Sequence, residues 1–496
     1  MMDLQSGLHR PKSTESLNGL RLNLASADER SDSQGTSALV TVPSAFGARN
    51  LFHSGLVEHL AGALDVVVAV PPDVRPLVEP ASVSKVWDLP EYRRTRKHTV
   101  ILESLRDAFF DRFGINSRDV LLKHRHRYKK KTIRSRLSEA SYKCLSPLGR
   151  FSSCYRWLEE TEQKLFRELI SEELQGRLLD SNIRFGLSTV FVSPSEWLLA
   201  RALQEVGIPT ATHILSFDNL TSMGYRPLKK FDLFLAWSER MATELQDFYG
   251  VPREKIEITG TPQFDFHVRE DRRWSRQKTC AALGVSSDEP FVIYCANTIR
   301  QTPREPELLL HVISEFKKQR GLRNLQWVVR LHPFDDYERW DGVLAEVPEV
   351  KLHRPWVHPV GTATYWGTLK DDDVSMLGNA LRHSALALSI GSTIALDCAV
   401  VDAPIVNIGF HPDRGSVEDR YYFNAHRSHH YTPITESGAA PVAHNIAELI
   451  NLATEAVESR SARSDRRRSL KELMCGPVDG YAADRIFTAL SRRFLQ

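Results

Sequence analysis

The chain has 496 residues, 65 Lys and Arg against 62 Asp and Glu, and a formal net charge of +3. This near-neutral balance excludes a protein that binds polyanions over its whole surface, and the length indicates two domains. Six cysteines without a CxxC pair argue against a disulfide framework and against a zinc site. No run approaches about 18 uninterrupted apolar residues, so no membrane-spanning helix is expected. We therefore expect a cytoplasmic protein.

The N-terminal residues 1–37 are rich in Ser, Asp, Arg and Gly and lack the apolar segment of a secretion signal. This composition predicts a disordered leader. The apolar runs 38–42 and 65–70 are typical of buried strands, and residues 43–60 between them predict a turn followed by a helix. Together they form a β-α-β unit, which opens an N-terminal lobe expected over residues 38–270.

Residues 93–179 are helix-prone and are expected to form an insert in this lobe. Within them, the window Lys123–Arg136 has eight Lys or Arg and no acid. Three interpretations are open: a solvated helix face, attachment to an anionic membrane surface, and nucleic-acid binding. Nucleic acid is the weakest, because aromatic residues are sparse there and no nucleic-acid-binding module is recognisable. Attachment to lipid would place the protein on the inner face of the cell membrane.

The remaining strand patterns fall into two series. Those of the N-terminal lobe are expected at residues 188–192, 209–214, 233–237 and 255–259. Those of a C-terminal lobe, residues 271–477, are expected at 291–295, 325–330, 350–353, 385–390 and 405–408. Residues 459–471 form a second basic patch within it, and residues 478–496 predict a closing helix. The alternation of strands and helices predicts an α/β fold with two parallel sheets and right-handed crossovers.

The segment Ser389–Cys398 is the most informative part of the chain. It predicts the end of a buried strand, a small-residue turn, and a helix that starts at Ser392 or Thr393. The free N–H groups of such a helix start, together with the helix dipole, favour a phosphate. Upstream, an apolar strand ends in Arg330 and His332, which also favour anions.

The C-terminal lobe thus has four elements at predicted strand ends. They are Asn297 with Thr298, Arg330 with His332, Ser392 with Thr393, and Asp397 one helical turn further on. Each alone has a simpler interpretation, such as a loop cap or a helix cap. Their order and spacing together favour a nucleotide-diphosphate site at the carboxyl edge of a parallel sheet.

Several of these segments carry a resemblance to a known family. They are Asp218–Ser222, Trp237-Ser238, Gly250, Ile258–Asp265, Arg330–Pro333 and Ser392-Thr393 with Asp397, in that order. The chain resembles the bacterial GT-B-type transferases of surface-polysaccharide and teichoic-acid synthesis, in particular the CDP-glycerol glycerophosphotransferase-like and capsule glycosyltransferase groups. The resemblance covers roughly residues 187–486, with a looser match at residues 38–71.

The resemblance implies two Rossmann-like lobes around a cleft, with a nucleotide-activated donor held as a substrate by the C-terminal lobe. Arg330, His332, Ser392 and Thr393 would contact its phosphates, and Asp397 its ribose, although the family often has Glu there. A glycan or lipid-linked acceptor would enter from the N-terminal lobe. No cofactor and no metal are expected, because Arg, His and a helix N-terminus can neutralise a leaving diphosphate.

Two further groups of residues complete this interpretation. Asp371–Asp373 precedes a predicted helix and is interpreted as its acidic N-terminal cap. An inverting transfer needs a general base, for which the N-terminal lobe offers His53, Glu196, His213 and Asp218. We select Asp218 and His53, although Asp218 also fits an Asx-turn and His53 an ordinary helix histidine. Arg49 and Asn50 are expected to bind acceptor or to close on the donor.

The function predicted from the sequence is a metal-independent transferase. It would move a glycosyl or glycerol-phosphate-like unit from a nucleotide-activated donor to a cell-surface glycan precursor. Two alternatives stay open: a nucleotide-sugar epimerase of the same fold, and a catalytically silent binding or scaffold protein.

Overall fold

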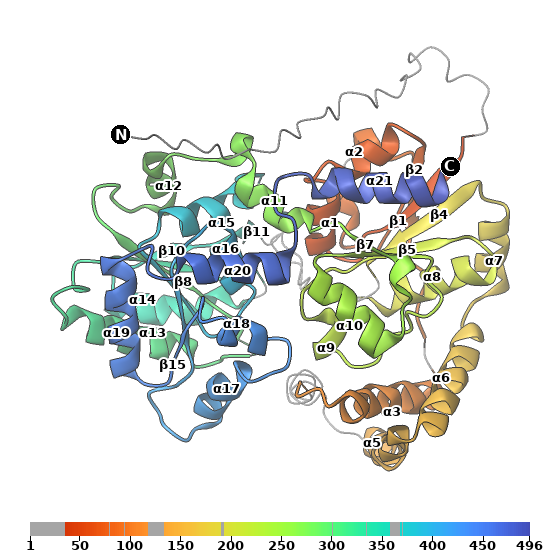
Figure 1. The fold of residues 1–496 in the computed structure, drawn as a ribbon, viewed down its shortest axis with the longest axis horizontal. Coiled ribbons are helices and arrows are strands. Elements are labelled where there is room, and N and C mark those ends of the chain that lie inside the picture. The colour runs from red at the N-terminus through yellow and green to blue at the C-terminus, as the bar shows by residue number, and fades with distance from the viewer. Residues whose placement is uncertain are drawn as a thin grey trace, which may run out of the picture. The chain divides into compact units, whose positions relative to one another are not determined.

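The structure is a computed structural model, and Figure 1 shows its fold. It describes residues 35–496 apart from 79, 94, 118–132, 190–192, 300, 334, 358–367 and 370. Residues 36–496 form one compact unit. Residues 1–34 of the expected leader and most of the basic window Lys123–Arg136 lie outside the described residues, whereas Ser37, the last residue of the expected leader, belongs to the first strand.

The first sheet has, among the described residues, seven parallel strands in the order β3-β2-β1-β4-β5-β6-β7. The strands are β1 (Ser37–Thr41), β2 (Asp65–Val70), β3 (Lys85–Asp88), β4 (Ile183–Ser188), β5 (Thr210–His213), β6 (Leu233–Ala236) and β7 (Ile256–Ile258). Strands β1 and β2 are almost entirely buried, as apolar runs in a parallel sheet should be. β4 begins at Ile183, before the expected strand 188–192, of which residues 190–192 lie outside the described residues. Arg184, the second residue of β4, donates to the Phe494 carbonyl.

Helices connect these strands. They are α1 (Ala45–Leu51), α2 (Leu56–Ala61), α8 (Pro194–Glu205), α9 (Asn219–Ser222), α10 (Glu239–Tyr249) and α11 (Pro262–Val268). The single helix expected up to residue 60 is in fact α1 and α2, separated by a turn in which Gly55 adopts φ 85°. Ser44 caps α1 by accepting a hydrogen bond from the Gly47 N–H, which directs the helix away from the carboxyl end of β1.

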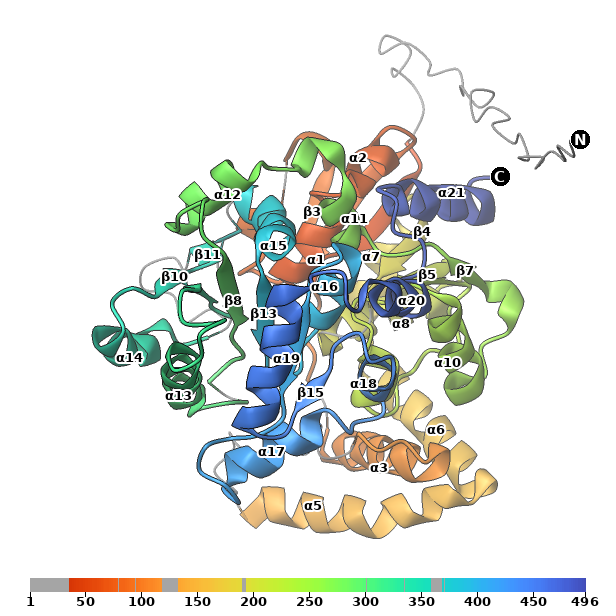
Figure 2. The same cartoon turned by 60° about the vertical axis from the view of Figure 1, so that its left-hand side comes forward.

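The helical insert lies between β3 and β4. It consists of α3 (Arg96–Phe113), α5 (Ile133–Leu145), the 3-10 turn η5 (Ser146–Arg150), α6 (Ser152–Arg167) and α7 (Glu172–Leu179). Figure 2 shows α3, α5 and α6 together at one end of the molecule, and α3 contacts both of the others. Phe109 of α3 and Leu158 and Phe166 of α6 are buried in the core shared with the first sheet.

The second sheet has, in the described part, six parallel strands in the order β10-β9-β8-β13-β14-β15. They are β8 (Phe291–Cys295), β9 (Gln326–Arg330), β10 (Lys351–His353), β13 (Leu386–Ser389), β14 (Ile405–Ile408) and β15 (Val442–Ala443). An antiparallel pair, β11 (Trp356–Val357) and β12 (Thr368–Leu369), stands apart from it. The helices are α12 (Arg276–Leu283), α13 (Glu305–Lys317), α14 (Asp341–Glu346), α15 (Asp371–His383), α16 (Ile394–Val400), α17 (Val417–Ala425), α18 (Thr432–Glu436), α19 (Ile446–Glu458) and α20 (Ser464–Cys475).

The last helix, α21 (Ala482–Phe494), returns to the first sheet. Ile486, Leu490 and Phe494 are buried in the same core as β1 and β2, and the Phe494 ring stacks on Phe185 with centroids 5.0 Å apart. The chain therefore passes between the two sheets twice, once after β7 and once after α20.

The segment after α20, where the chain returns to the first sheet, packs closely against residues that follow β6 and β7. Gly476 has φ +68°, and a Cβ added there would lie 1.9 Å from the Trp237 carbonyl oxygen. A Cβ added at Gly260, which has φ +71°, would lie 2.3 Å from the Pro477 carbonyl oxygen. Only glycine satisfies both the left-handed backbone and this close approach.

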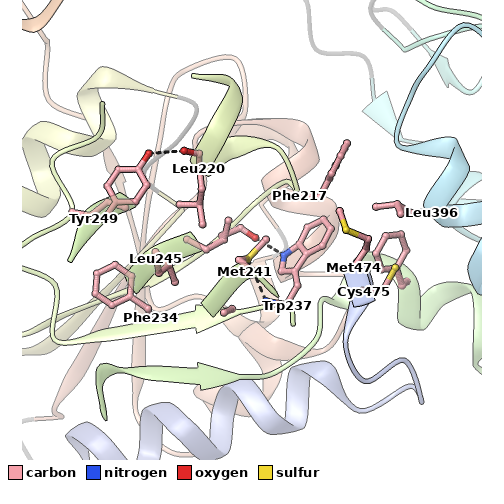
Figure 3. Packing of buried hydrophobic residues seen from close by; sticks show 14 of the residues in the cluster. Phe217, Leu220, Phe234, Trp237, Met241, Leu245, Tyr249, Leu396, Met474 and Cys475 are labelled. Atoms are coloured by element: carbon pink, nitrogen blue, oxygen red, sulfur yellow. Dashed lines mark hydrogen bonds between the residues drawn. The ribbon is translucent and has the colours of Figure 1, made fainter. Parts of the chain in front are cut away.

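One apolar core links helices from both halves of the chain. Figure 3 shows Trp237 near Phe217 and Met241, with Leu396, Met474 and Cys475 of the second half close by. The buried indole donates through Nε1 to the Ile214 carbonyl at 2.6 Å. Burial of apolar surface of this kind is the main favourable contribution to holding the two halves together.

The basic patch expected at residues 459–471 has a structural role. Arg460 donates to the Ser384 and Arg382 carbonyls at the end of α15, at 2.6 and 2.8 Å. Arg467 pairs with Asp402 at 2.6 Å. Guanidinium groups satisfy carbonyls at a helix C-terminus, where the dipole also favours positive charge. In the described part of the chain, no helix is long and apolar enough to cross a membrane.

Candidate functional site

The loop after β8 carries two of the predicted site residues, Asn297 and Thr298. Glu305, which is buried at the start of α13, accepts hydrogen bonds from the Asn297 N–H at 3.0 Å, the Thr302 hydroxyl at 2.7 Å and the Tyr294 hydroxyl at 3.0 Å. Burial raises the pKa of Glu305 to about 7, although Arg339 opposes this shift. The carboxyl group of Glu305 thus holds the loop after β8 through its hydrogen bonds to Asn297 and Thr302.

A second buried carboxylate ties this loop to the loop after β9. Asp335 accepts from the Ile299 N–H at 2.7 Å and from the Trp340 indole N–H at 2.9 Å. Arg339 pairs with Asp335 at 2.7 Å and with Glu305 at 3.1 Å. Because each buried charge has partners, the network holds both loops in one arrangement.

Arg330 is the last residue of β9 and is buried. Its two terminal nitrogens donate to the two oxygens of Asp373 at 2.9 and 3.0 Å, and one of them also lies 2.9 Å from His353 Nδ1. Burial opposes the charge of Arg330, but the Asp373 carboxylate outweighs it and raises the pKa. α15 begins at Asp371, earlier than expected, so Asp373 lies inside its first turn and does not precede it. Asp373 is also the bidentate partner of Arg330.

His332 follows β9 and is half-buried. Burial, together with the nearby charges of Arg330 and Arg339, lowers its pKa to about 4. The imidazole is therefore neutral at pH 7, so it can hydrogen-bond to an anion but brings no positive charge to it.

The Gly391–Thr393 turn connects β13 to α16. The helix begins at Ile394 with Thr393 as its N-cap residue, slightly later than expected. Gly391 has φ +88°, and the ring of His426 occupies the side on which a Cβ would stand. The Ser392 N–H lies 3.3 Å from the hydroxyl of Tyr431. The turn is thus backed by two buried side chains from residues 426–431.

Asp397 is buried on α16 and faces the first half of the chain. Its Oδ1 lies 2.7 Å from Nε2 of His267, which is buried on α11. At least one carboxylate oxygen therefore serves a contact between the two halves. This partner of Asp397 was missed by the sequence analysis, although His267 stands two residues after the Ile258–Asp265 motif.

Arg49 brings a charge of the first half to the same place. Burial lowers its pKa to about 10, while Asp397 and Asp373 raise it and Arg330 lowers it further. Asp397, Asp373 and Arg330 therefore each lie within electrostatic range of Arg49. Consistent with this placement, α1 contacts both α11 and β12. Next to Arg49, the side-chain nitrogen of Asn50 is buried without a hydrogen-bond partner among the described residues.

The two residues selected as bases lie on other loops of the first half. Asp218 precedes α9 and accepts from the Ser216 and Ser222 hydroxyls, each at 2.6 Å. It therefore shapes its own loop, which was the alternative interpretation. It also lies within electrostatic range of His430 from the second half. His53 is half-buried in the turn between α1 and α2.

The other two residues considered as a general base, Glu196 and His213, are buried. Glu196 accepts from the Thr41 hydroxyl, the Ser188 hydroxyl and the Thr189 N–H, so it joins the carboxyl ends of β1 and β4. Burial lowers the pKa of His213 at the end of β5 to about 4. Neither is suited to take a proton from a substrate. No group of three or more His, Cys, Asp or Glu that could hold a metal occurs among the described residues.

Comparison with known proteins identifies the fold. No family model matches the chain, and no curated protein matches it in sequence. A putative UDP-N-acetylglucosamine 2-epimerase from Listeria monocytogenes is similar in structure, with a TM-score of 0.51 and 12% identity over 92% of this chain and 96% of that one. Two others are the Neisseria meningitidis UDP-GlcNAc 2-epimerase bound to UDP-GlcNAc (TM-score 0.48, 12% identity, 92% and 100% covered) and the calicheamicin glycosyltransferase CalG4 (0.48, 13%, 93% and 99%).

At such identities the likeness concerns the fold alone. The two parallel sheets and the Listeria structure together give the chain a GT-B-like α/β fold, as the sequence predicted.

Proposed function

We propose that the protein binds a nucleotide-activated sugar, or a CDP-glycerol-like donor, between its two halves and transfers the activated unit to a glycan or lipid-linked acceptor. One observation carries the proposal: two guanidinium groups, Arg49 from the first half and Arg330 from the second, lie in electrostatic range of each other. Asp373 already pairs with Arg330, but no ion pair joins Arg49 to a carboxylate among the described residues, so the Arg49 guanidinium is available to bind an added anion.

The donor diphosphate would lie against the carboxyl edge of the second sheet. Arg330 offers five N–H donors, of which Asp373 and His353 engage some. His332 would add a neutral N–H. The backbone N–H of Thr393 would add a further donor, and so would that of Ser392 in place of its present bond to the Tyr431 hydroxyl. Asn297 and Thr298 would line the same edge. Asp397 would accept a hydrogen bond from the ribose through Oδ2, because His267 bonds to Oδ1. Such a set neutralises a leaving diphosphate without a metal and needs no cofactor.

The acceptor would enter from the first half, with Asp218 or His53 as the general base. Asp218 is the better placed of the two, because it lies within electrostatic range of a residue of the second half, His430. Its two serine hydroxyl partners would orient the carboxylate. The family resemblance supports a surface-glycan precursor as the acceptor. The positive charge of Lys123–Arg136 supports attachment of that window to the inner face of the membrane.

A second candidate is epimerisation of a nucleotide sugar. It is favoured by the structural similarity to the Listeria protein, a putative UDP-N-acetylglucosamine 2-epimerase. Against it, the two carboxylates near Arg49 already have buried partners, Arg330 and His267. Incubation with UDP-N-acetylglucosamine and no acceptor separates the two: an epimer in the product would establish epimerisation.

The test of the donor site is a thermal-shift titration with CDP, UDP, GDP, dTDP and ADP, with and without magnesium. We expect one nucleotide to raise the melting temperature, independently of magnesium, because a ligand that binds the folded state alone stabilises it. His332→Ala should remove the shift, whereas His311→Ala, a half-buried histidine of α13, should keep it. No shift with any nucleotide would leave a silent scaffold as the better description.

A further inference from the structure

The helical insert exposes a group of large apolar side chains. Leu148 is 45% exposed, Phe151 64% and Trp157 52%. They lie close together in the sequence, where η5 leads into α6. Single exposed apolar residues are ordinary on a protein surface, but several large ones close together indicate a site that contacts another protein or a membrane.

Two of these side chains, Leu148 and Trp157, line one hollow of about 190 Å³ together with Leu145, Ser153, Cys154 and Leu158. Phe151 lies between them in the sequence, directly before α6. Cys154, Trp157 and Leu158 are spaced so that they share one face of α6. A Cβ added at Gly149 would lie 2.3 Å from the Ala108 Cβ. This close approach shows that η5 packs directly on α3, while Leu148 and Phe151 remain exposed.

The surface has a positive rim. Lys143, Arg150 and Arg156 are exposed, and residues 140–158 contain no Asp or Glu. Lys143 forms an ion pair with Glu139 at 2.8 Å. No ion pair joins Arg150 or Arg156 to another residue in the part of the chain that the structure describes. The rim therefore has positive charge available for an external anion.

We propose that this surface, defined by Leu148, Phe151 and Trp157 with Arg150 and Arg156, docks on an anionic lipid bilayer. Aromatic and aliphatic side chains enter the boundary between headgroups and acyl chains, and basic residues beside them attract anionic headgroups. A second copy of the chain fits less well, because a twofold contact would set the same positive rim against itself. The proposal does not depend on the reaction that the protein catalyses.

The test is cosedimentation of the full chain with vesicles. Vesicles of phosphatidylcholine with phosphatidylglycerol should retain the protein, vesicles of phosphatidylcholine alone should not, and added NaCl should release it. The double variant Phe151→Ser/Trp157→Ser should bind at least about tenfold more weakly, and Arg150→Glu/Arg156→Glu should also lose binding. Leu179→Ser, which removes a side chain of similar exposure (67%) at the end of α7, should bind as the unaltered protein does.

A second readout reports insertion itself. Acyl chains brominated near the headgroup should quench the fluorescence of Trp157 when it inserts. In Trp157→Phe, the brominated lipid should therefore cause no such quenching. Because the altered side chains are exposed, the variants should keep the melting temperature of the parent. If Phe151→Ser/Trp157→Ser were retained by the anionic vesicles as well as the parent protein is, the proposal would be overturned. A dimer in light scattering that Phe151→Ser/Trp157→Ser dissociates would also overturn it.

Discussion

His267 and Asp397 form a buried contact between the two halves of the chain, with Nε2 and Oδ1 2.7 Å apart. His267 belongs to α11, which follows the first sheet, and Asp397 to α16 of the second. The contact stands beside Arg49 and the Arg330–Asp373 pair. The place where the halves are joined is therefore also the place where the proposed diphosphate would bind.

Loss of the histidine should destabilise the fold. In His267→Ala, the Asp397 carboxylate stays buried without its partner, which costs about 3–5 kcal/mol. Urea unfolding at pH 7 measures this change. His383→Ala serves as a control, because His383 is only half-buried and its ring lies against a backbone carbonyl, that of Trp274. Equal effects of the two substitutions would show that the contact with Asp397 has no special weight.

Arg49 and Arg330 should respond differently to removal. Arg49→Ala should weaken nucleotide binding at least about tenfold, or about 1.4 kcal/mol, with no loss of stability, because burial disfavours the charged form of this residue. Arg330→Ala should weaken binding and also lower the free energy of unfolding by about 3–5 kcal/mol, because Asp373 loses its bidentate partner. Calorimetric titration and urea unfolding of both variants give the comparison. Unchanged affinity in Arg49→Ala would contradict the proposed site.

The buried His213 should contribute to acid instability. Its pKa is about 4 in the folded protein and about 6.5 when unfolded, so the unfolded state binds more protons between these values. Stability should therefore fall as pH decreases from about 7 to about 4, by about 3 kcal/mol for this group. In His213→Gln this part of the pH dependence should disappear. Urea unfolding between pH 4.5 and 7.5 tests it, and parallel curves for variant and parent would contradict it.

The approach of Gly476 to Trp237 should tolerate no side chain. Gly476→Ala meets the Trp237 carbonyl oxygen and a left-handed backbone at once, so we expect a loss of at least about 3 kcal/mol. Gly250→Ala is the matched control, because Gly250 has φ +64° but nothing within 4 Å of an added Cβ. It should lose only about 1–2 kcal/mol. Thermal unfolding of both proteins separates the contact from the backbone conformation.

The sheets were predictable because parallel strands are buried on both faces and appear as short apolar runs. Residues 65–70 and 405–408 are such runs, and β2 and β14 have these bounds. Strand β4 was misplaced because it contains Arg184 and Gly186, which break the apolar pattern. The short β11, β12 and β15 have too few residues to form a pattern, and none was expected.

The candidate site was predictable only in part, for a related reason. The carboxyl ends of strands can be located from local sequence, so the positions of Arg330 and of the Gly391–Thr393 turn followed from their strands. The partners could not be located in this way, since Asp373 lies 43 residues from Arg330 and His267 lies 130 residues from Asp397. Such pairings depend on the three-dimensional path of the chain, and no local pattern records it.

The double passage between the sheets limits how the chain can be divided. A cut near residue 270 would leave the first sheet without α21, whose Ile486, Leu490 and Phe494 complete its core. The first fragment would expose that apolar surface, and the second would carry an amphipathic helix with nothing to pack against. Two separately expressed fragments should therefore recover the fold only when mixed, whereas a circular permutant that joins the C-terminus to Thr36 and opens a surface loop elsewhere keeps every core intact.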